Sequence, residues 1–484
     1  MIVIGGGLAG LSSAVALAEA GCRVRLFEKR PHLGGRAASY VLPGGEHVDN
    51  CQHVTLGCCV NLEDFYRRVG ASQKIRYYDR LLFSGPDGRR GFLESSPLPA
   101  PLHMAPWFAV FPLLGWADKF AIARAMLAIA QHGGPPPDAG SQAAGVTMLN
   151  WLRIHGQTDL AIRRFWEVVL VSALNEELGR MDARYGINVF WKAFLSNRAG
   201  YRVGIPSVPL GELYDGCRVA IERRGGEVFL RSGIRRLHTS GGRIVAAETE
   251  RGDLETADDY IAALPYESLP ALLPPGVAQS EPVFAGLRHL RVSPITSVHL
   301  WLDRPVMSEP FLALLDSTTQ WVFNKTLLTH DSDNDDSDGA GQYLQLVISA
   351  SRGLVPLSRQ EIIRHCLGEL GRVLPAIRGA TLLKGTVIKE VSATFSPVPG
   401  SDQWRPSQKS PLPGLFLAGD WTRTGWPATM EGAVRSGYLA AEAILAAPGK
   451  FLKPDLPAEG LARFWARGAV GPGADGLAVP HGDQ

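Results

Sequence analysis

The hydrophobic pattern at the start of the chain predicts a strand, a helix and a second strand. Ile2 to Ile4 form a short β-branched run, and Leu11 to Ala20 continue as an apolar, alanine-rich segment typical of a helix. Gly21 ends this helix, and the following residues "CRVRLFEK" predict a second strand. This order predicts a parallel βαβ unit at the amino terminus.

Two further patterns follow in the middle and at the end of the chain. Between residues 116 and 200, apolar side chains recur at three- and four-residue spacing, as in "WADKFAIARAMLAIAQ", and predict helices. The segments "SVHLWLD", "QWVFNK" and "QYLQLVISA" predict strands of a second sheet. Near the carboxyl end, a strand from Leu415 to Ala418 and a helix from about Thr429 predict a further element of the first unit.

Three glycines connect the first strand to the helix in the spacing G-x-G-x-x-G. Gly5 permits the tight turn, Gly7 lets the backbone approach a pyrophosphate, and Gly10 lets helix and strand pack closely. Glu28, at the end of the second strand, can accept hydrogen bonds from ribose hydroxyls, and its charge disfavours the 2′-phosphate of NADP. These residues, in this order, predict a dinucleotide site, with Lys29 beside it.

Two other segments favour FAD as the dinucleotide. In "HLGGRAASY", Gly35 and Arg36 can bring backbone and a guanidinium to the cofactor phosphates, although a glycine turn with a surface arginine is the alternative. In "LFLAGDWTRTGWPATMEGAVRSG", Asp420 follows Gly419 at a strand end, and Thr429 can act as the N-cap of the last helix. The start of that helix can then face the polar groups of a flavin.

The motifs at the two ends resemble those of the flavin-containing amine oxidase and phytoene desaturase superfamily, over nearly the whole chain. More narrowly, the chain resembles the squalene-associated FAD-dependent enzymes called hydroxysqualene dehydroxylases, in the segments "DNCQHVTLGCCVNLEDFYRRVG", "VSALNEELGRM", "ATFSPVPGSDQWRP" and "LAGDWTRTGWPATMEGAVRSG". The cofactor contacts that the resemblance implies are the phosphate turn Gly5, Gly7 and Gly10, the ribose acid Glu28, the second phosphate contact Gly35 and Arg36, the acid beside the ribityl and phosphate chain Asp420, the isoalloxazine neighbour Met430 and the adenine contact Ile234. Ile234 stands where valine is more usual, a change that a backbone contact tolerates.

The cofactor elements are discontinuous in the sequence. We expect an α/β fold with a Rossmann-like FAD-binding domain and an α+β substrate domain. The FAD-binding domain should comprise residues 1–95, 205–265 and 410–447, and the substrate domain residues 96–204 and 266–409. The substrate domain should hold a mixed sheet and a helical subdomain that enclose an apolar chamber over the flavin. The Gly/Pro-rich tail, 448–484, is expected to be disordered.

Composition narrows the partners and the compartment. Charged residues make up 20% of the 484 positions and the net charge is +2, which predicts neither a nucleic-acid footprint nor an acidic tail. The six cysteines lack the spacing of a disulfide framework, and the first residues already predict a strand, so we expect a cytoplasmic protein without an export signal.

The stretch from 95 to 117 has an unusual composition. It carries no Asp, Glu, Lys or Arg, but five prolines exclude a membrane-spanning helix. Two interpretations stay open: an interfacial entrance for a water-insoluble substrate, with peripheral contact at the inner face of the cell membrane, or a covered loop.

The resemblance implies a redox reaction on a long isoprenoid. In the dehydroxylases the reaction is reductive: hydroxysqualene loses its hydroxyl group, gains a hydride and becomes squalene, on the route to hopanoids and other triterpenoids. Reduced FAD would supply the hydride, and the electron donor is unidentified, because no second G-x-G-x-x-G unit for a nicotinamide is apparent. The alternatives are an oxidative carotenoid-type desaturase, an amine oxidase, and a flavin-binding scaffold of a terpenoid assembly without its own turnover. The oligomeric state is not predicted.

The segment "DNCQHVTLGCCVNL" holds the candidate catalytic residues. His53 can supply or relay the proton that the leaving hydroxyl needs, and Asp49 can orient it or act as the acid itself. A core histidine and a turn-forming aspartate are the alternative. No C-x-x-C pair accompanies the cysteines, so we expect no metal site, and we interpret Cys58 and Cys59 as packing residues.

Two further groups of residues have competing interpretations. Aromatic faces would stabilise positive charge at the reacting carbon. The candidates are Trp166, Phe190, Trp191 and Trp321. In the alternative interpretation, these four are ordinary core residues. The acidic stretch "DSDNDDSDGAGQ" resembles the start of a calcium loop, but Asp336 stands where a glycine is needed and Gln342 where a glutamate is needed. We interpret it as a solvated hairpin loop.

Overall fold

In the computed structural model, which describes residues 1–134, 145–329 and 341–466, five parallel strands form the first sheet. Their order is β10-β2-β1-β14-β20, and their bounds are Glu227–Leu230, Arg25–Glu28, Ile2–Ile4, Tyr260–Ala262 and Leu415–Leu417. The central strands are short apolar runs buried on both faces, as parallel strands covered by helices require. All five come from the three segments that we expected to hold the cofactor.

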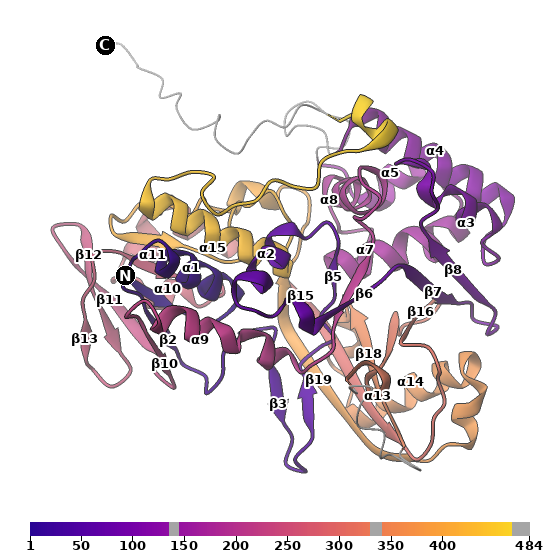
Figure 1. Ribbon diagram of the computed structural model, residues 1–484, viewed down its shortest axis with the longest axis horizontal. Helices are drawn as coiled ribbons and strands as arrows, with labels where there is room; N and C mark the ends of the chain where they lie inside the picture. Colours follow the sequence, from indigo (N-terminus) through magenta and orange to yellow (C-terminus); the bar gives the residue numbers. More distant parts are fainter. Residues whose placement is uncertain (135–144, 330–340, 467–484) are drawn as a thin grey trace.

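The helices around this sheet are α1 (Leu8–Glu19), α2 (Val60–Arg68), α9 (Asp215–Glu222) and α15 (Met430–Leu445). Of these, α1 and α15 pack closely against each other (Figure 1). Ser12 Oγ on α1 donates to the carbonyl of Val434 on α15 at 3.3 Å. A Cβ on Gly437 would lie only 2.1 Å from Ser12 Oγ. The small residues on this face of α15 therefore let the two backbones approach.

A second sheet of seven strands has the order β19-β15-β18-β17-β16-β7-β8. Its strands are β7 (Arg80–Ser84), β8 (Arg90–Glu94), β15 (Val292–Leu302), β16 (Phe311–Leu314), β17 (Trp321–Asn324), β18 (Gln342–Ser349) and β19 (Leu382–Phe395). β7 and β16 pair in parallel, and the other neighbours are antiparallel. The predicted mixed sheet is confirmed, with β15, β17 and β18 at the three segments that predicted its strands.

Strands β7 and β8 belong to this second sheet, although we placed residues 1–95 in the cofactor domain. Phe83 lies opposite Ala313, and Ser84 lies opposite Leu314, in the ladder between β7 and β16. The expected boundary was wrong here because the partner strand lies far along the chain. The local pattern of residues 80–94 carries no information about that pairing.

Three small sheets complete the β structure. They are formed by β3 (Ser39–Val41) with β4 (His47–Asp49), by β5 (Thr55–Leu56), β9 (Val203–Pro206) and β6 (Ile75–Tyr78), and by β11 (Ile234–Ser240), β12 (Arg243–Thr249) and β13 (Leu254–Glu255). β11 and β12 form a hairpin, and the connecting Gly241 and Gly242 take left-handed φ values of 56° and 76°. Residues 227–230, just before this hairpin, belong to β10 in the first sheet.

A group of helices lies beside β7 and β8, at the end of the molecule opposite the amino terminus (Figure 1). It consists of α3 (Ala105–Val110), α4 (Trp116–His132), α5 (Met148–Ile154), α6 (Asp159–Ala161), α7 (Glu167–Leu174) and α8 (Ala183–Phe190), with π-helical turns at Ile162–Trp166 and Trp191–Leu195. These are the helices predicted between residues 116 and 200, preceded by α3. The other helices are α10 (Leu269–Leu272), α11 (Val277–Ser280), α12 (Pro282–Gly286), α13 (Lys325–Thr329) and α14 (Arg359–Val373). Within the described ranges, no helix combines the length and the apolarity that crossing a bilayer would take.

Residues 448–466 fold onto the molecule, although we expected the tail from 448 to be disordered. Phe451 and Leu452 are buried, and the carboxylate of Glu442 on α15 accepts hydrogen bonds from their backbone N–H groups at 2.7 Å each. Composition predicted disorder, but this buried carboxylate satisfies the backbone of the turn that follows α15. Residues 467–484, and Asp331, Asp333 and Asp335 of the acidic stretch, lie outside the described residues.

The substitution Gly437→Val tests the close contact between α1 and α15. A Cβ there would meet Ser12 Oγ at 2.1 Å and the carbonyl oxygen of Ala9 at 2.4 Å, so the two helices would have to separate. We expect the free energy of unfolding, measured by urea denaturation, to fall by about 1–3 kcal/mol. Gly371→Ala in α14 is the control, because a Cβ there meets nothing within 4 Å, and it should not destabilise the protein. Equal destabilisation by both substitutions would contradict this packing.

Candidate flavin site

Two glycine loops lie side by side at the carboxyl ends of β1 and β2. Gly7 and Gly34 form a parallel bridge, and the Gly34 N–H donates to the carbonyl of Gly6 at 2.8 Å. A Cβ on Gly10 would lie 1.9 Å from the Gly5 carbonyl oxygen, so packing alone excludes a side chain there. At Gly7, by contrast, a Cβ would meet only the Cα of Gly35, at 3.8 Å. Protein packing leaves this position open, as a cradle for a pyrophosphate requires.

The groups around this cradle suit a dinucleotide. Gly7 is the N-cap of α1 and provides no side-chain cap, so the N–H groups of the first turn are available to an anion. The buried carboxylate of Glu28 accepts hydrogen bonds from the Gly6 N–H at 2.6 Å and from the Arg30 N–H at 2.8 Å. Both bonds hold it at the rim of the cradle, where a ribose would lie. Lys29 is exposed next to it, and no hydrogen-bond partner for its side chain occurs in the described ranges.

The amino-terminal and carboxyl-terminal parts of the site meet in an ion pair. Arg36 Nη2 lies 2.6 Å from Asp420 Oδ1, and Arg36 Nη1 donates to the carbonyl of Ala393 at 2.8 Å. Asp420 is buried, and the N–H of the preceding Gly419 donates to Ser436 Oγ on α15 at 2.8 Å. Arg36 is therefore not simply a surface arginine after a glycine turn, because it joins the second glycine loop to the turn after β20.

The start of α15 has the cap that the sequence predicted. Thr429 is the N-cap, and its Oγ1 accepts a hydrogen bond from the Gly432 N–H at 3.0 Å. Met430 is the first helical residue, and its Sδ lies 3.9 Å from the hydroxyl of Tyr66. Glu431, fully buried, accepts from the Leu62 N–H at 2.7 Å and thereby caps α2. Burial raises the pKa of Glu431, against the nearby guanidinium of Arg435.

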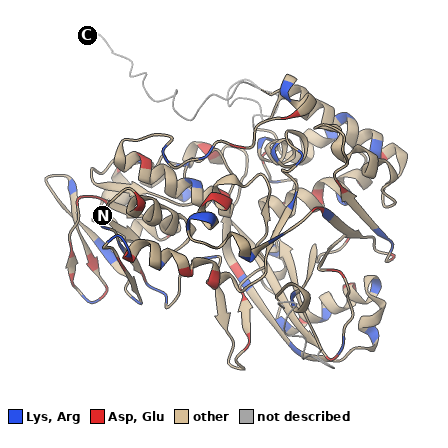
Figure 2. Ribbon diagram, in the orientation of Figure 1, with Lys and Arg blue, Asp and Glu red and all other residues tan. Residues whose placement is uncertain are grey.

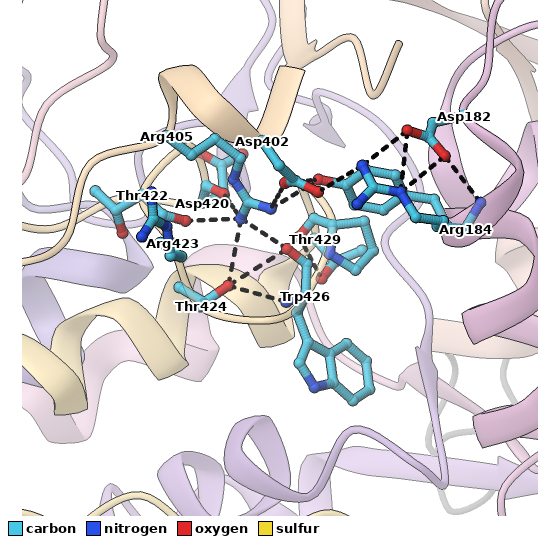
Figure 3. A network of polar contacts seen from close by, with 12 residues as sticks. Asp182, Arg184, Asp402, Arg405, Asp420, Thr422, Arg423, Thr424, Trp426 and Thr429 are labelled. Carbon is cyan, nitrogen blue, oxygen red and sulfur yellow. Dashed lines mark hydrogen bonds and ion pairs between the residues drawn. The ribbon is translucent and has the colours of Figure 1, made fainter. Parts of the chain in front are cut away.

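Arg405, which we did not single out from the sequence, fixes the loop between β20 and α15. Its buried guanidinium lies 4.8 Å from the centroid of the Phe395 ring and donates to the hydroxyl of Tyr185 at 2.8 Å. Figure 3 shows the same guanidinium between Asp402 and the loop, where it donates to the carbonyls of Asp420, Thr422 and Trp426. A lone arginine in "SDQWRP" gives no local signal of this role, because the loop carbonyls that it binds belong to residues 15 to 21 positions further on.

Ile234 lies at the start of β11, opposite Thr249. The residues just before it run beside the end of β2: the Ser232 N–H donates to the carbonyl of Glu28 at 2.9 Å, and the Arg231 N–H donates to that of Arg30 at 3.1 Å. This segment therefore lies on the Glu28 side of the cradle, where the adenosine end of a dinucleotide is expected.

Asp49 belongs to a buried polar cluster that the sequence did not reveal in full. Lys325 Nζ lies 3.0 Å from Asp49 Oδ2 and 3.0 Å from Gln52 Oε1, and both ionic side chains are almost fully buried, 4% and 3% exposed. Asp49 also accepts from Ser39 Oγ at 2.7 Å and from the Leu210 N–H at 3.0 Å. Lys325 was missed because a lysine at the end of a strand is usually a surface residue.

His53 makes its hydrogen bond with the backbone. Its Nδ1 lies 3.0 Å from the carbonyl oxygen of Cys51, so Nδ1 carries the proton and Nε2 has none in the neutral imidazole. Asp49 makes no direct hydrogen bond to His53; its oxygens accept from Ser39 Oγ, the Leu210 N–H and Lys325 Nζ instead. Burial lowers the pKa of His53. No partner for Nε2 occurs among the residues that the structure describes.

The cysteines of this stretch are packing residues. Cys51 and Cys58 are buried, and Cys58 packs with Ala193 and Trp426. Burial raises the pKa of the Cys51 thiol to about 12, which makes a reactive thiolate unfavourable. Over the described ranges, no group of three or more His, Cys, Asp or Glu residues is arranged to hold a metal ion.

An apolar cavity of about 260 Å³ lies between β7, β8, α3 and α4. Within the described residues, Arg164 is the single ionisable side chain in its lining, and it is paired with Asp316 at 2.6 Å. Phe83 and Phe111 of its wall belong to the same buried cluster of apolar side chains as Cys51, two residues before His53. The apolar lining of this cavity suits a hydrocarbon.

The four aromatic candidates divide into two groups. Trp166 and Phe190 are fully buried and pack against each other with ring centroids 4.5 Å apart, and Trp191 is also buried, so these three fit the core interpretation. Trp321 on β17 is partly exposed, and its Nε1 donates to Ser172 Oγ at 2.6 Å. Of the four, Trp321 is the one whose ring lies beside other aromatic rings of the second sheet, those of Phe311 and Phe323.

A glycine cradle on a parallel sheet, next to a second, mixed sheet, is the arrangement of a flavin-dependent oxidoreductase. Residues 8–445 match the family of flavin-containing amine oxidoreductases, and the chain belongs to this family. The protein is therefore an FAD-dependent oxidoreductase, and the residues around the cradle fit that cofactor.

Relatives and solved structures are similar to this chain over most of its length. The 15-cis-phytoene desaturase of Narcissus pseudonarcissus is 28% identical, over 92% of this chain and 79% of its own. The zeta-carotene desaturase of Synechocystis sp. is 26% identical, over 92% of this chain and 96% of its own. An oxidoreductase from Methanosarcina mazei has the same fold, with a TM-score of 0.70 at 17% identity over 92% of this chain and 99% of its own. So does the cyclohexylamine oxidase of Brevibacterium oxydans, with a TM-score of 0.68 at 16% identity over 92% and 98%.

The substitution Lys325→Met tests the buried ion pair. It leaves the Asp49 carboxylate buried without its cation, and we expect the free energy of unfolding to fall by about 3–5 kcal/mol in urea denaturation of the FAD-bound protein. The double variant Lys325→Met/Asp49→Asn should cost less than the sum of the two single variants, since it removes both charges. Arg23→Met, in an exposed pair with Glu227, is the control and should change stability by less than about 1 kcal/mol. Additive costs at Lys325 and Asp49 would show that the pair is not coupled.

Proposed function

We propose that the protein catalyses the reductive dehydroxylation of hydroxysqualene to squalene. The observation that carries the substrate class is the cavity beside β7 and β8, because its lining is apolar except for Arg164, which Asp316 already pairs. A cavity of this kind suits a long hydrocarbon better than an amine. The segments around Asp49, Leu174, Phe395 and Asp420 resemble those of the hydroxysqualene dehydroxylases and support the narrower choice.

The proposed step is balanced by one hydride from reduced FAD and one further proton. Bound reduced FAD supplies a hydride equivalent. At one carbon of the substrate the C–O bond breaks and a C–H bond forms, and the hydroxyl leaves as water after taking up a proton. The protein holds the hydrocarbon in a dry chamber, excludes water from the reacting carbon and provides that proton. An external two-electron donor, which we have not identified, must reduce the cofactor again.

His53 is our candidate for the proton donor. Its Nδ1–H is bound to the Cys51 carbonyl, which leaves Nε2 as the position that can gain and lose a proton. The charge of Asp49 raises the pKa of the His53 imidazole, and the charge of Lys325 lowers it. Asp49 is less suited to be the acid, because Lys325, Ser39 and the Leu210 N–H all donate to its carboxylate.

A second candidate function is oxidative desaturation of an isoprenoid. Two relatives named as desaturases, of phytoene and of zeta-carotene, align over 92% of this chain, which favours it. The same chamber and the same cofactor would serve, with the electrons flowing from substrate to FAD. Amine oxidation and a flavin-binding scaffold without turnover are the remaining alternatives.

Anaerobic incubation of the photoreduced enzyme with hydroxysqualene separates these functions. We expect the flavin absorbance to return as one equivalent of squalene forms, because the substrate is the only oxidant present. No other electron acceptor is added. In the reverse control, oxidised enzyme is mixed with phytoene, and we expect no reduced flavin to form. Reduction of the flavin by phytoene would favour the desaturase, and a lack of turnover with every isoprenoid would favour the scaffold.

The pH dependence of the single-turnover rate tests His53. Burial lowers the pKa of the imidazole, so the protonated form is populated only as the pH falls toward and below the ordinary value of about 6.5. We expect the rate with prereduced enzyme to rise as the pH is lowered from about 8 to 6, and His53→Gln to lower it by about 10²–10⁴ and remove this dependence. His365→Gln, at an exposed position on α14, is the control. A near-wild-type rate in His53→Gln with FAD still bound would eliminate His53 as the acid.

A further inference from the structure

Helix α4 turns apolar side chains outward. Trp116, Phe120 and Leu127 are 64%, 72% and 49% exposed, and the exposed Ala123 lies between them. At spacings of three and four residues, these side chains share one face of the helix. The opposite face, with Ile122, is buried against the protein. α4 is thus apolar on both sides, whereas a surface helix normally turns a polar face to water.

Neighbouring segments extend this outward face. Leu102, Val110 and Phe464 are 46%, 68% and 82% exposed. Lys119 Nζ on α4 donates to the carbonyl of Ala109 at 2.7 Å, which holds the end of α3 beside α4. The Leu461 N–H donates to the carbonyl of Ala100 at 2.8 Å, which holds the segment of Phe464 against the segment of Leu102. We name the apolar surface after its six exposed members, Leu102, Val110, Trp116, Phe120, Leu127 and Phe464.

The apolar surface surrounds an opening of the cavity. Leu102 and Leu127 are half exposed and also line the cavity, so the cavity reaches the surface between them. Trp465, next to Phe464, lines it from a third side. In Figure 1, α3 and α4 lie at the end of the molecule away from the first sheet, where a flat partner can reach them. Any partner on this surface therefore covers the entrance to the proposed substrate chamber.

The exposed charges within the two segments that form the apolar surface are cationic. In residues 95–134 and 460–466, the exposed charged side chains are Arg124 and Arg463, both cationic. Asp118 is buried, where it caps α4 through the Gly115 N–H at 2.9 Å. α3 has no charged residue, and its ribbon is tan throughout in Figure 2. Exposed aromatic and aliphatic side chains beside cations match the chemistry of an anionic lipid surface.

We propose that the apolar surface inserts into the interfacial layer of an anionic lipid bilayer, and that the hydrocarbon substrate passes from the bilayer directly into the cavity. The second part rests on the proposed function, because only a water-insoluble substrate requires this route. The first part does not rest on it. Of the stretch from 95 to 117, Ala100, Phe111, Leu113 and Leu114 are buried, so α4 and residues 460–466 provide much of the contact.

Co-sedimentation with vesicles tests the lipid contact without turnover. The full-length FAD-bound protein is mixed with vesicles of phosphatidylcholine alone or with about one third phosphatidylglycerol. We expect binding to the mixed vesicles and at least about tenfold weaker binding of the variant Trp116→Ser/Phe120→Ser/Phe464→Ser. None of these three residues lines the cavity. The control Val41→Ser/Leu254→Ser/Leu383→Ser removes three side chains of similar exposure from strands β3, β13 and β19 and should bind like the wild type.

Activity then separates this proposal from the proposed function. The triple variant at the apolar surface should keep its rate with substrate in detergent and lose about tenfold or more with substrate embedded in vesicles. Equal vesicle binding by wild type and variant, or no binding by the wild type, would overturn the lipid contact. Dimers of the wild type that the variant lacks, seen by light scattering, would also overturn it and assign the surface to a second copy of the chain. Vesicle binding without activity on any isoprenoid would leave the lipid contact intact and reject the proposed function.

Discussion

The ion pair between Arg36 and Asp420 is the contact on which the cofactor site depends. It joins residues that are 384 positions apart in the sequence, at 2.6 Å, and it exists only when the first sheet has closed through β14 and β20. The first glycine loop lies against the second through Gly7 and Gly34, and the second is tied to the turn before α15 by Arg36. Arg405 then holds that turn by its carbonyls. The cradle is therefore assembled by long-range contacts, not by one local motif.

A second ionic contact connects the cofactor side to the second sheet. Lys325 follows β17 directly and reaches Asp49 at the end of β4, with both charges out of solvent. A buried pair of this kind seldom adds much net stability, but loss of one partner is costly, so the two elements are held in one arrangement. His53 lies four residues beyond Asp49 in the sequence. The pair thus fixes the polar cluster between the end of β4 and the residue that follows β17.

The parts of the fold that the sequence predicted are those with local causes. The βαβ unit, the glycine spacing, the end position of Glu28 and the Thr429 cap each follow from a few adjacent residues. The membership of β7 and β8, the role of Arg405 and the partner of Asp49 were not predictable, since each depends on a residue far along the chain. The tail shows the same limit: its composition indicated disorder, but Glu442 binds the backbone of Phe451 and Leu452. Family resemblance supplied the site residues where local pattern ended.

The proposed chemistry combines these parts: a reduced flavin in the cradle, an apolar chamber, and His53 as the proton donor. Its central claim is that hydrogen is added at the carbon that loses the hydroxyl group. The most direct measurement is mass and NMR analysis of the product formed by prereduced enzyme and hydroxysqualene in D2O, since the transferable hydrogen of reduced flavin exchanges with solvent. We expect squalene with one deuterium, at the carbon that carried the hydroxyl group. Unlabelled squalene, or a product that has lost two hydrogens from the substrate, would contradict it.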